Sequence, residues 1–133
     1  TMAYAIADGL SREDVQFQMF NLKHSHRSDV MTEMLDAAAL LFGSSTLNNG
    51  MMPQIADMLC YVKGLRPVGR LGAAFGSYGW SGEAVKLVTE TLTEMKVELA
   101  DPGLRVKFVP SAEDLGKCVE LGRKVGRMVK ERA

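Results

Sequence analysis

Two uninterrupted apolar runs, residues 37–43 and 71–76, constrain the fold of this chain most. A strand with one solvated face alternates apolar and polar residues, so a continuous run indicates a strand covered on both faces. Each run leads into a loop rich in glycine and hydroxyl residues, 43–50 and 76–82, and then into a helical pattern. The sequence therefore predicts an α/β fold in which both loops lie at the carboxyl ends of neighbouring parallel strands, where ligands bind in such sheets.

The rest of the chain alternates between helical and extended patterns. Apolar residues at helical spacing predict helices from Thr1 to Leu10, from Ser28 or Asp29 to about Asp36, from Pro53 to Gly64, after a cap at Ser81, and after Ser111, which forms a capping box with Asp114. Alternation over 15–20 and 104–109 predicts two outer strands. The expected fold is a three-layer, doubly wound parallel sheet of order 2-1-3-4-5, with the first strand absent from this chain.

Composition limits the possible functions. A chain of 133 residues fits one domain, and its 16 basic residues equal its 16 acidic ones, so nothing indicates a nucleic-acid partner. No stretch approaches the roughly 20 apolar residues of a membrane span, and no signal pattern opens the chain, so we expect a soluble cytoplasmic protein. Cys60 and Cys118 are far apart and are interpreted as reduced thiols, while His24 and His26 lack further ligands for a metal.

Four segments together suggest a family. They are residues 27–33, 44–50 and 72–84 and the Glu-Asp-Leu to Leu-Gly-Arg stretch over 113–123, and the glycine-rich and aromatic 72–84 segment is the most specific. Over nearly its whole length the chain resembles the flavodoxin-like FMN domain of flavodiiron proteins, also called A-type flavoproteins. The resemblance implies one FMN-binding domain over 1–133 that passes electrons from a donor such as rubredoxin or reduced deazaflavin. The implied acceptor is a diiron site that reduces O2 or NO, in a separate metallo-β-lactamase-like domain of a homo-oligomer.

The resemblance also implies which residues hold FMN, and it implies no catalytic residue and no metal ligand in this chain. The first loop would contact the ribityl chain and the polar ring edge, and the second would form the other wall. The implied residues are Ser44, Ser45, Thr46, Leu47, Asn48, Asn49, Ser77, Tyr78, Gly79, Trp80 and Gly82, with Thr1 as the remnant of a phosphate loop. Aromatic side chains can cover the flavin ring, and glycines let main-chain N–H groups approach its polar edge.

Two departures from the family pattern affect this interpretation. Ser45 stands where the family usually has proline, so the first loop should be less rigid. A strand and a phosphate-binding loop precede the first helix in the family, whereas residue 1 here already lies at the end of that loop. If no segment precedes it, we expect weak FMN binding and poor solubility, because amides at such a helix terminus normally bind the phosphate.

Two alternatives remain open from the sequence. Either loop alone is consistent with a tight turn, and Trp80 alone with a residue that covers the core. The domain would then be an interaction or structural module without flavin, or it would be a stand-alone FMN quinone reductase. A hydrolase built on Ser77, Ser81 and the histidines is disfavoured, because no Gly-x-Ser-x-Gly elbow occurs.

Overall fold

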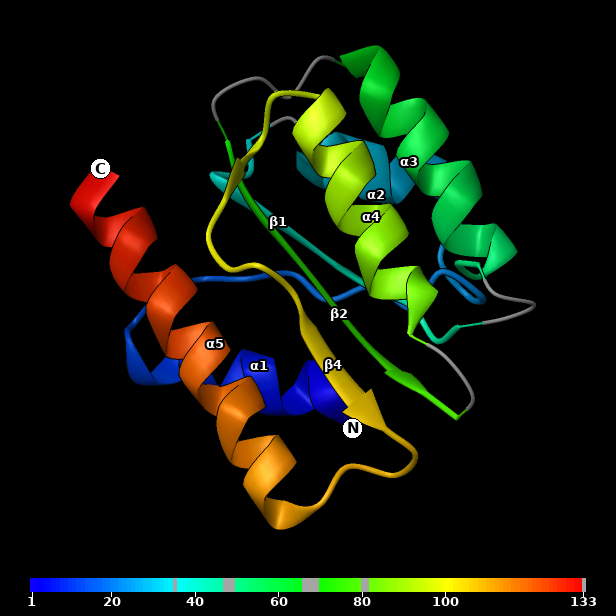
Figure 1. Cartoon of the computed structure of the whole chain (residues 1–133). Helices are drawn as coiled ribbons and strands as arrows, with labels where there is room; N and C mark the ends of the chain where they lie inside the picture. Colours follow the sequence, from blue (N-terminus) through cyan, green and yellow to red (C-terminus); the bar gives the residue numbers. More distant parts are fainter. Residues whose placement is uncertain (35, 47–49, 66–69, 80–81, 133) are drawn as a thin grey trace.

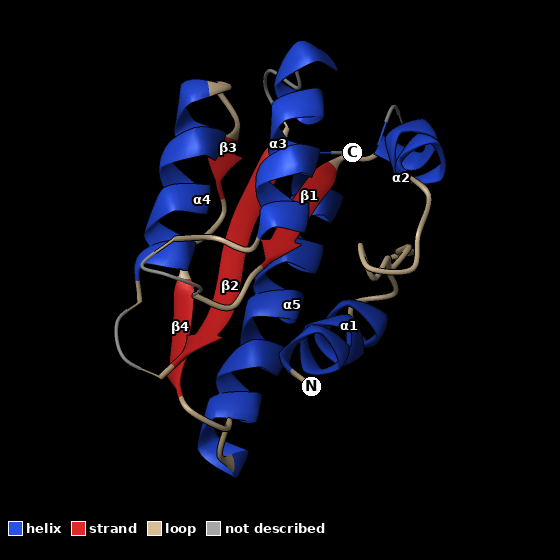
Figure 2. Ribbon diagram, turned by 90° about the vertical axis from the view of Figure 1, so that its right-hand side faces the viewer, coloured by secondary structure: helices blue, strands red, loops and turns tan. Residues whose placement is uncertain are grey.

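The computed structural model describes the whole chain except residues 35, 47–49, 66–69, 80–81 and 133. A parallel sheet separates two layers of helices (Figures 1 and 2), with α1 and α5 on one face and α3 and α4 on the other, where α2 lies beside α3. The three-layer α/β fold expected from the sequence is therefore confirmed. The elements in chain order are α1 (Met2–Arg12), α2 (Arg27–Met34), β1 (Ala39–Gly43), α3 (Pro53–Leu65), β2 (Leu71–Tyr78), α4 (Glu83–Glu94), β3 (Glu98–Leu99), β4 (Leu104–Lys107) and α5 (Ala112–Arg132).

The strand β2 is the centre of the sheet, and all of its pairings are parallel. It pairs with β1 along one edge, where Ala39 lies opposite Leu71 and Gly43 opposite Phe75. On its other edge it pairs first with β3 and then, nearer its carboxyl end, with β4. The two continuous apolar runs overlap β1 and β2. Cover on both faces is confirmed for β2, whose first four residues are all buried, whereas in β1 the buried residues alternate with half-buried ones.

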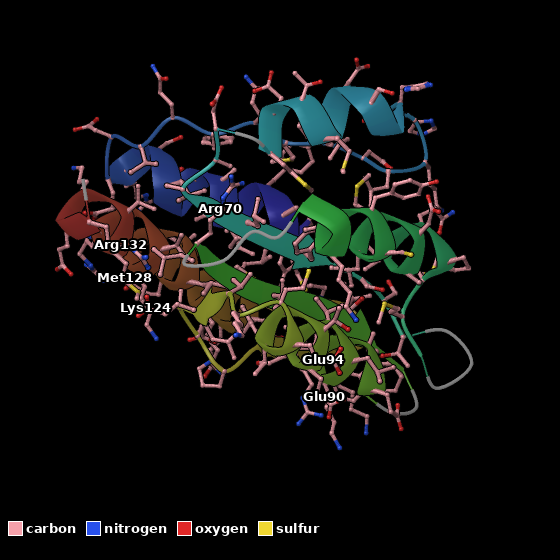
Figure 3. All side chains as sticks on the ribbon, turned by 90° about the horizontal axis from the view of Figure 1, so that it is seen from above. Arg70, Glu90, Glu94, Lys124, Met128 and Arg132 are labelled. Atoms are coloured by element: carbon pink, nitrogen blue, oxygen red, sulfur yellow. The ribbon has the colours of Figure 1, made fainter. Side chains whose placement is uncertain are left out.

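A separate apolar core fills each layer. Val88 and Leu92 of α4 and Val62 of α3 are at most 1% exposed and pack on one face of the sheet. On the other face Cys118 and Val125 of α5 pack with α1, and they too are at most 1% exposed. Figure 3 labels Glu90 and Glu94, which are exposed on α4, and Lys124 and Arg132 of α5, which form ion pairs with Asp101 and Glu98.

The helices α1 and α5 approach each other through glycine. A Cβ atom on Gly122 would lie 2.9 Å from the carbonyl carbon of Ile6 and still closer to its oxygen, and one on Gly9 would overlap the carbonyl oxygen of Val119. No side chain fits between the two backbones at these points. The contact also carries an ion pair in which Arg123 Nε donates to Glu13 at 3.2 Å.

The strand predicted over 15–20 is wrong, and a short strand was missed. Residues 15–20 follow α1 and form neither a helix nor a pairing with a described strand. The side chains of Phe17 and Met19 are 42% and 41% exposed. Alternation alone does not make a strand, because a strand also needs a neighbour for its main-chain groups. The predicted strand 104–109 ends at Lys107, and the missed strand β3 has only the residues Glu98 and Leu99, which is too short for a periodic signal.

The helix caps agree with the sequence only in part. The capping box is confirmed, because Asp114 N–H donates to Ser111 Oγ at 3.2 Å and Ser111 N–H donates to the Asp114 carboxylate at 3.0 Å. The cap predicted for α2 is wrong. His26 caps this helix instead: its carbonyl accepts hydrogen bonds from the N–H groups of Asp29 and Val30, and its Nδ1 accepts one from Ser28 N–H at 3.1 Å. The predicted cap Ser81 lies outside the described residues, and Gly82 occupies the N-cap position of α4.

The capping box predicts a change of stability in acid. Hydrogen bonds from the main-chain N–H and then the hydroxyl of Ser111 lower the pKa of Asp114 below its ordinary value of 3.8. A carboxylate whose pKa is lowered on folding stabilises the fold above its unfolded pKa and loses that contribution as the pH falls through the lower folded value. We expect Asp114→Asn to be less stable than the wild type at pH 7 and to converge with it below about pH 4. Thermal melts of both proteins across this pH range measure the difference. A difference in Tm that does not change with pH would show that the carboxylate contributes nothing.

Two features are absent from the described part of the chain. No helix there is both long enough and apolar enough to cross a bilayer. In the same part of the chain, no three side chains of the metal-binding types gather closely enough to hold a metal ion.

Candidate functional site

The two loops singled out in the sequence meet beyond the carboxyl ends of β1 and β2. Ser44 N–H donates to the Phe75 carbonyl at 3.0 Å, and Thr46 N–H donates to the Ser77 carbonyl at 3.3 Å, which extends the parallel ladder into the first loop. In addition, Ala84 N–H in the first turn of α4 donates to Thr46 Oγ1 at 3.2 Å. The first loop is therefore bonded both to the end of β2 and to the start of the helix that follows the second loop.

Ser44 closes the first loop on itself. It is the buried polar residue of the described core, 6% exposed, and its hydroxyl accepts a hydrogen bond from Met52 N–H at 2.8 Å while donating to the Ser45 carbonyl at 2.9 Å. The hydroxyl oxygen of Ser44 thus forms hydrogen bonds at both ends of the loop. Ser44 and Thr46, which the family resemblance assigned to FMN binding, use their hydroxyl groups here to position the loop.

This arrangement predicts a stability loss on removing the Ser44 hydroxyl. Ser44→Ala leaves the N–H of Met52 without its acceptor in a buried setting, which costs about 1–3 kcal/mol. The neighbouring change Ser45→Ala is the control, because Ser45 is exposed and its side chain should contribute almost nothing. Urea unfolding of both variants measures the difference. Equal midpoints for the two variants would contradict the role given to Ser44.

The second loop begins at an aromatic residue covered by a cation. The guanidinium carbon of Arg105 lies 5.9 Å from the centre of the Tyr78 ring, and the same arginine passes close to Gly82, where a Cβ atom would lie 3.0 Å from its Nη1. Glycine at position 82 thus makes room for Arg105 beside Tyr78. Arg105 was not singled out in the sequence, where it is one polar residue of an alternating strand.

A second aromatic residue borders this loop. Phe108 is 64% exposed and lies next to Gly79, and its N–H donates to the Tyr78 carbonyl at 2.6 Å. Its φ of 61° is unusual for a bulky residue, and such strain tends to occur at functional sites. The sequence analysis missed Phe108, although an aromatic residue directly after a strand at the ligand-binding edge is a signal that would have identified it.

A groove of about 1180 Å³ lies beside β1 and reaches the loops. Of the residues expected to bind FMN, Thr1, Ser44, Ser45 and Ser77 line it together. Thr46, Tyr78, Gly79 and Gly82 lie next to these residues along the same loops without lining the groove. Leu47, Asn48, Asn49 and Trp80 lie outside the described residues, so their assignments stay predictions.

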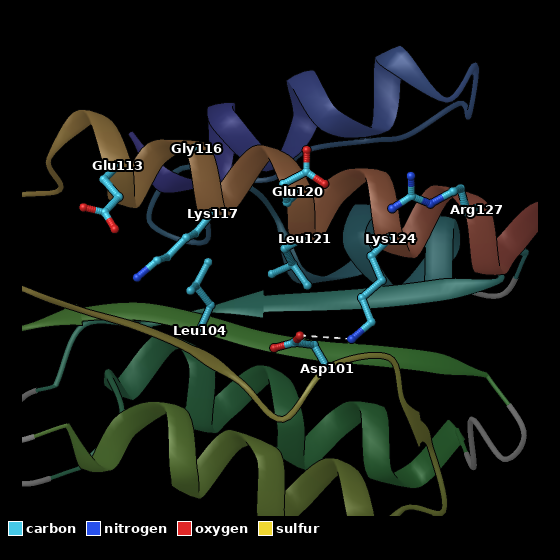
Figure 4. A pocket seen from close by; sticks show the side chains of 9 residues that line it. All are labelled: Asp101, Leu104, Glu113, Gly116, Lys117, Glu120, Leu121, Lys124 and Arg127. Carbon is cyan, nitrogen blue, oxygen red and sulfur yellow. Dashed lines mark hydrogen bonds and ion pairs between the residues drawn. The ribbon is translucent and has the colours of Figure 1, made fainter.

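A second, shallower hollow of about 630 Å³ lies on the far side of the sheet, between α5 and residues 101–104 (Figure 4). Lys124 spans it and pairs with Asp101 at 3.2 Å. The hollow carries three acidic and three basic side chains, so it has no net charge to attract an ion: Asp101, Glu113, Glu120, Lys117, Lys124 and Arg127. The site suggested by the sequence is therefore the loop pair beside the larger groove.

Comparison with known proteins establishes the family. The flavodoxin family model matches residues 1–122. This chain belongs to the flavodoxin family. Among curated proteins, the domain is 46% identical to a nitric oxide reductase of Moorella thermoacetica over 129 residues, which cover 96% of this chain and 32% of the relative.

Solved structures connect the domain to flavodiiron proteins. It matches rubredoxin oxygen:oxidoreductase of Desulfovibrio gigas with a TM-score of 0.95 at 37% identity, over 98% of this chain and 33% of that one. It matches the flavodiiron protein of Giardia intestinalis with a TM-score of 0.94 at 32% identity, over 98% of this chain and 32% of that one. The resemblance to flavodiiron FMN domains is thus confirmed, and the chain spans about a third of the length of these relatives.

The described residues fit the flavin that the family implies. Exposed Phe108, next to Gly79, offers an aromatic surface, and Ser45 and Ser77 of the two loops offer hydroxyl groups. A flat ring with one polar edge needs this combination of an apolar surface and a few fixed donors and acceptors. Thr1, which the resemblance assigned to the phosphate end, lines the same groove as Ser44 and Ser45.

Proposed function

We propose that this domain binds FMN and relays electrons within a flavodiiron-type oxidoreductase that reduces O2 or NO. The observation that carries the proposal is the pair of loops at the carboxyl edge of the sheet, hydrogen-bonded through Thr46 and Ser77, in a flavodoxin domain 46% identical to a nitric oxide reductase. When bound there, FMN supplies the one- and two-electron redox chemistry.

The residues of the chain act by binding and orienting. The hydroxyl groups of Ser44 and Thr46 hold the first loop, and Asn48 and Asn49 of that loop would contact the polar edge of the ring. Tyr78 and Trp80 on the second loop would cover a ring face and keep water away from it. In this proposal no side chain of the domain transfers a proton or forms a covalent bond.

The partners follow from the same family relationship. The names of the relatives describe reduction of nitric oxide and oxidation of rubredoxin by oxygen, so we propose a small redox donor such as rubredoxin or reduced deazaflavin. The proposed acceptor is a diiron centre in a metallo-β-lactamase-like domain of a homo-oligomer. The present chain spans 32% of the nitric oxide reductase, which leaves room for such a domain in a longer polypeptide.

A titration with FMN tests the proposal. Purified protein should quench the fluorescence of one equivalent of FMN, and Trp80→Ala should raise the Kd by roughly 5- to 150-fold, corresponding to about 1–3 kcal/mol of lost ring contact. Tyr61→Ala is the matched aromatic control, because Tyr61 is 44% exposed on α3 and belongs to neither loop.

Three other outcomes would redirect the interpretation. Protein that stays colourless after incubation with FMN would favour a flavin-free interaction module. Rapid direct oxidation of NAD(P)H by the flavin-loaded protein would favour a stand-alone quinone reductase. An unchanged Kd for Trp80→Ala would remove the tryptophan from the site while leaving the family assignment intact.

A further inference from the structure

We propose that Arg105 of β4 is a positioning residue of the flavin site: it fixes the ring of Tyr78 at the start of the second loop, and its positive charge favours reduced FMN. The inference rests on the proposed function, because it concerns how the domain holds the flavin. The residues that the family resemblance assigned to FMN do not include Arg105. The role follows from where β4 places this side chain.

The register of the sheet puts Arg105 and Tyr78 on the same face. β4 pairs with β2 so that Arg105 lies opposite Gly76 and Lys107 lies opposite Tyr78. Side chains alternate between the two faces of a strand, so Arg105 shares a face with Lys107 and with Tyr78. Val106 belongs to the core beneath α1 and α5, so Arg105 lies on the other face, which α3 and α4 cover.

The side chain of Arg105 bridges the two ends of the second loop. Its guanidinium carbon lies 5.9 Å from the centre of the Tyr78 ring, at the end of β2. At the start of α4, a Cβ atom on Gly82 would lie 3.0 Å from Arg105 Nη1, 3.1 Å from its Cδ and 3.4 Å from Tyr78 Cδ1. A side chain at position 82 would therefore crowd both Arg105 and the Tyr78 ring.

This position makes Arg105 a support for the Tyr78 ring. Tyr78 is the last residue of β2 and is half-buried, and the next residue along the loop, Gly79, is exposed. A planar guanidinium group can lie against an aromatic face, and the attraction between the cation and the ring favours that arrangement. Arg105 thus limits how the Tyr78 ring can turn before a flavin binds.

The charge of Arg105 is not neutralised by the described part of the chain. Its side chain is exposed, and none of the ion pairs between described residues includes it. Reduction of FMN by two electrons with uptake of one proton makes the ring one unit more negative. A nearby cation therefore stabilises the reduced form more than the oxidised form. Arg105 should accordingly raise the reduction potential of FMN held at this loop.

Two substitutions separate the position of the ring from the charge. Arg105→Lys keeps the charge but has no plane to lie against Tyr78, so it should raise the Kd for FMN roughly 2- to 5-fold and leave the midpoint potential unchanged. Arg105→Met keeps an unbranched chain that can pack on the ring and removes the charge. It should lower the ratio of reduced to oxidised FMN at a fixed potential about fivefold, which is about 20 mV for a two-electron couple.

The measurements are a fluorescence titration for the Kd and a redox titration at low ionic strength for the potential. Arg127→Met is the matched control, because it removes the same charge from an exposed position on α5, on the opposite face of the sheet. The control should change neither value. The shift caused by Arg105→Met should shrink at high salt, because salt screens the interaction of an exposed charge.

The contact between Arg105 and Tyr78 is also measurable in the protein without FMN. Because the guanidinium lies over the ring, NMR should show an upfield ring-current shift for the protons on Cδ of Arg105. Tyr78→Leu should abolish this shift, and Tyr78→Phe should retain it. This readout depends on neither the flavin nor the activity of a larger protein.

Three results would overturn the proposal. Wild-type protein that binds no FMN would overturn both this inference and the proposed function. Normal FMN binding with the same potential in the wild type and Arg105→Met, or an equal shift in Arg127→Met, would overturn the role of the Arg105 charge alone. An unchanged Kd in Arg105→Lys, with Arg105 protons that do not respond to Tyr78→Leu, would show that Arg105 does not position the ring.

Discussion

Gly122→Ala will destabilise this domain by about 3 kcal/mol, the upper end of the range for overpacking. The added methyl group on α5 would overlap the carbonyl oxygen of Ile6 and lie 3.0 Å from Leu10 N, both of which belong to the backbone of α1. A backbone cannot rotate away as a side chain does, so the two helices must separate. Separation would loosen the core that Cys118 and Val125 form with α1.

Gly116→Ala is the matched control on the same helix. A Cβ atom at Gly116 meets nothing within 4 Å, and alanine forms helix better than glycine by roughly 0.5–1 kcal/mol. Urea denaturation should therefore show opposite shifts for the two variants. Two shifts of the same sign would contradict the close approach of α1 and α5.

Gly76→Ala is expected to damage both stability and the loop site. A Cβ atom here would overlap the carbonyl oxygen of Ser44 and lie 3.0 Å from its carbonyl carbon, where the first loop leaves the sheet. We expect a loss of about 3 kcal/mol in stability. We also expect FMN binding weaker by at least about tenfold, or 1.4 kcal/mol, because the loop that contains Thr46 must move.

The control for Gly76→Ala lies away from the loops. Gly64→Ala places its methyl group near the end of α3 in open space, so unfolding should show no loss of stability and FMN titration should show no change. The two measurements on Gly76→Ala separate its two effects. Normal FMN affinity in a destabilised variant would show that the first loop does not depend on its contact with β2.

The sequence alone was sufficient to infer the layers and the two neighbouring strands, although β1 begins at Ala39 rather than Ala37 and β2 ends at Tyr78 rather than Gly76. Continuous apolar runs require cover on both faces, and this identified β1 and β2 without any knowledge of their neighbours. The capping box at Ser111 and Asp114 was equally local, because its two residues are close in the chain. The family also followed from local motifs, since the segments that carry it are short and contiguous.

Tertiary structure decided what depends on distant neighbours. Residues 15–20 alternate like a strand, yet no described strand pairs with them, so the pattern could not decide their state. The roles of Gly122 and Arg105 were likewise hidden, because each depends on a part of the chain far away in sequence: α1 for Gly122 and Tyr78 for Arg105. Local periodicity records which faces of a segment are apolar, whereas hydrogen-bond partners and close backbone contacts exist only once the segments have packed.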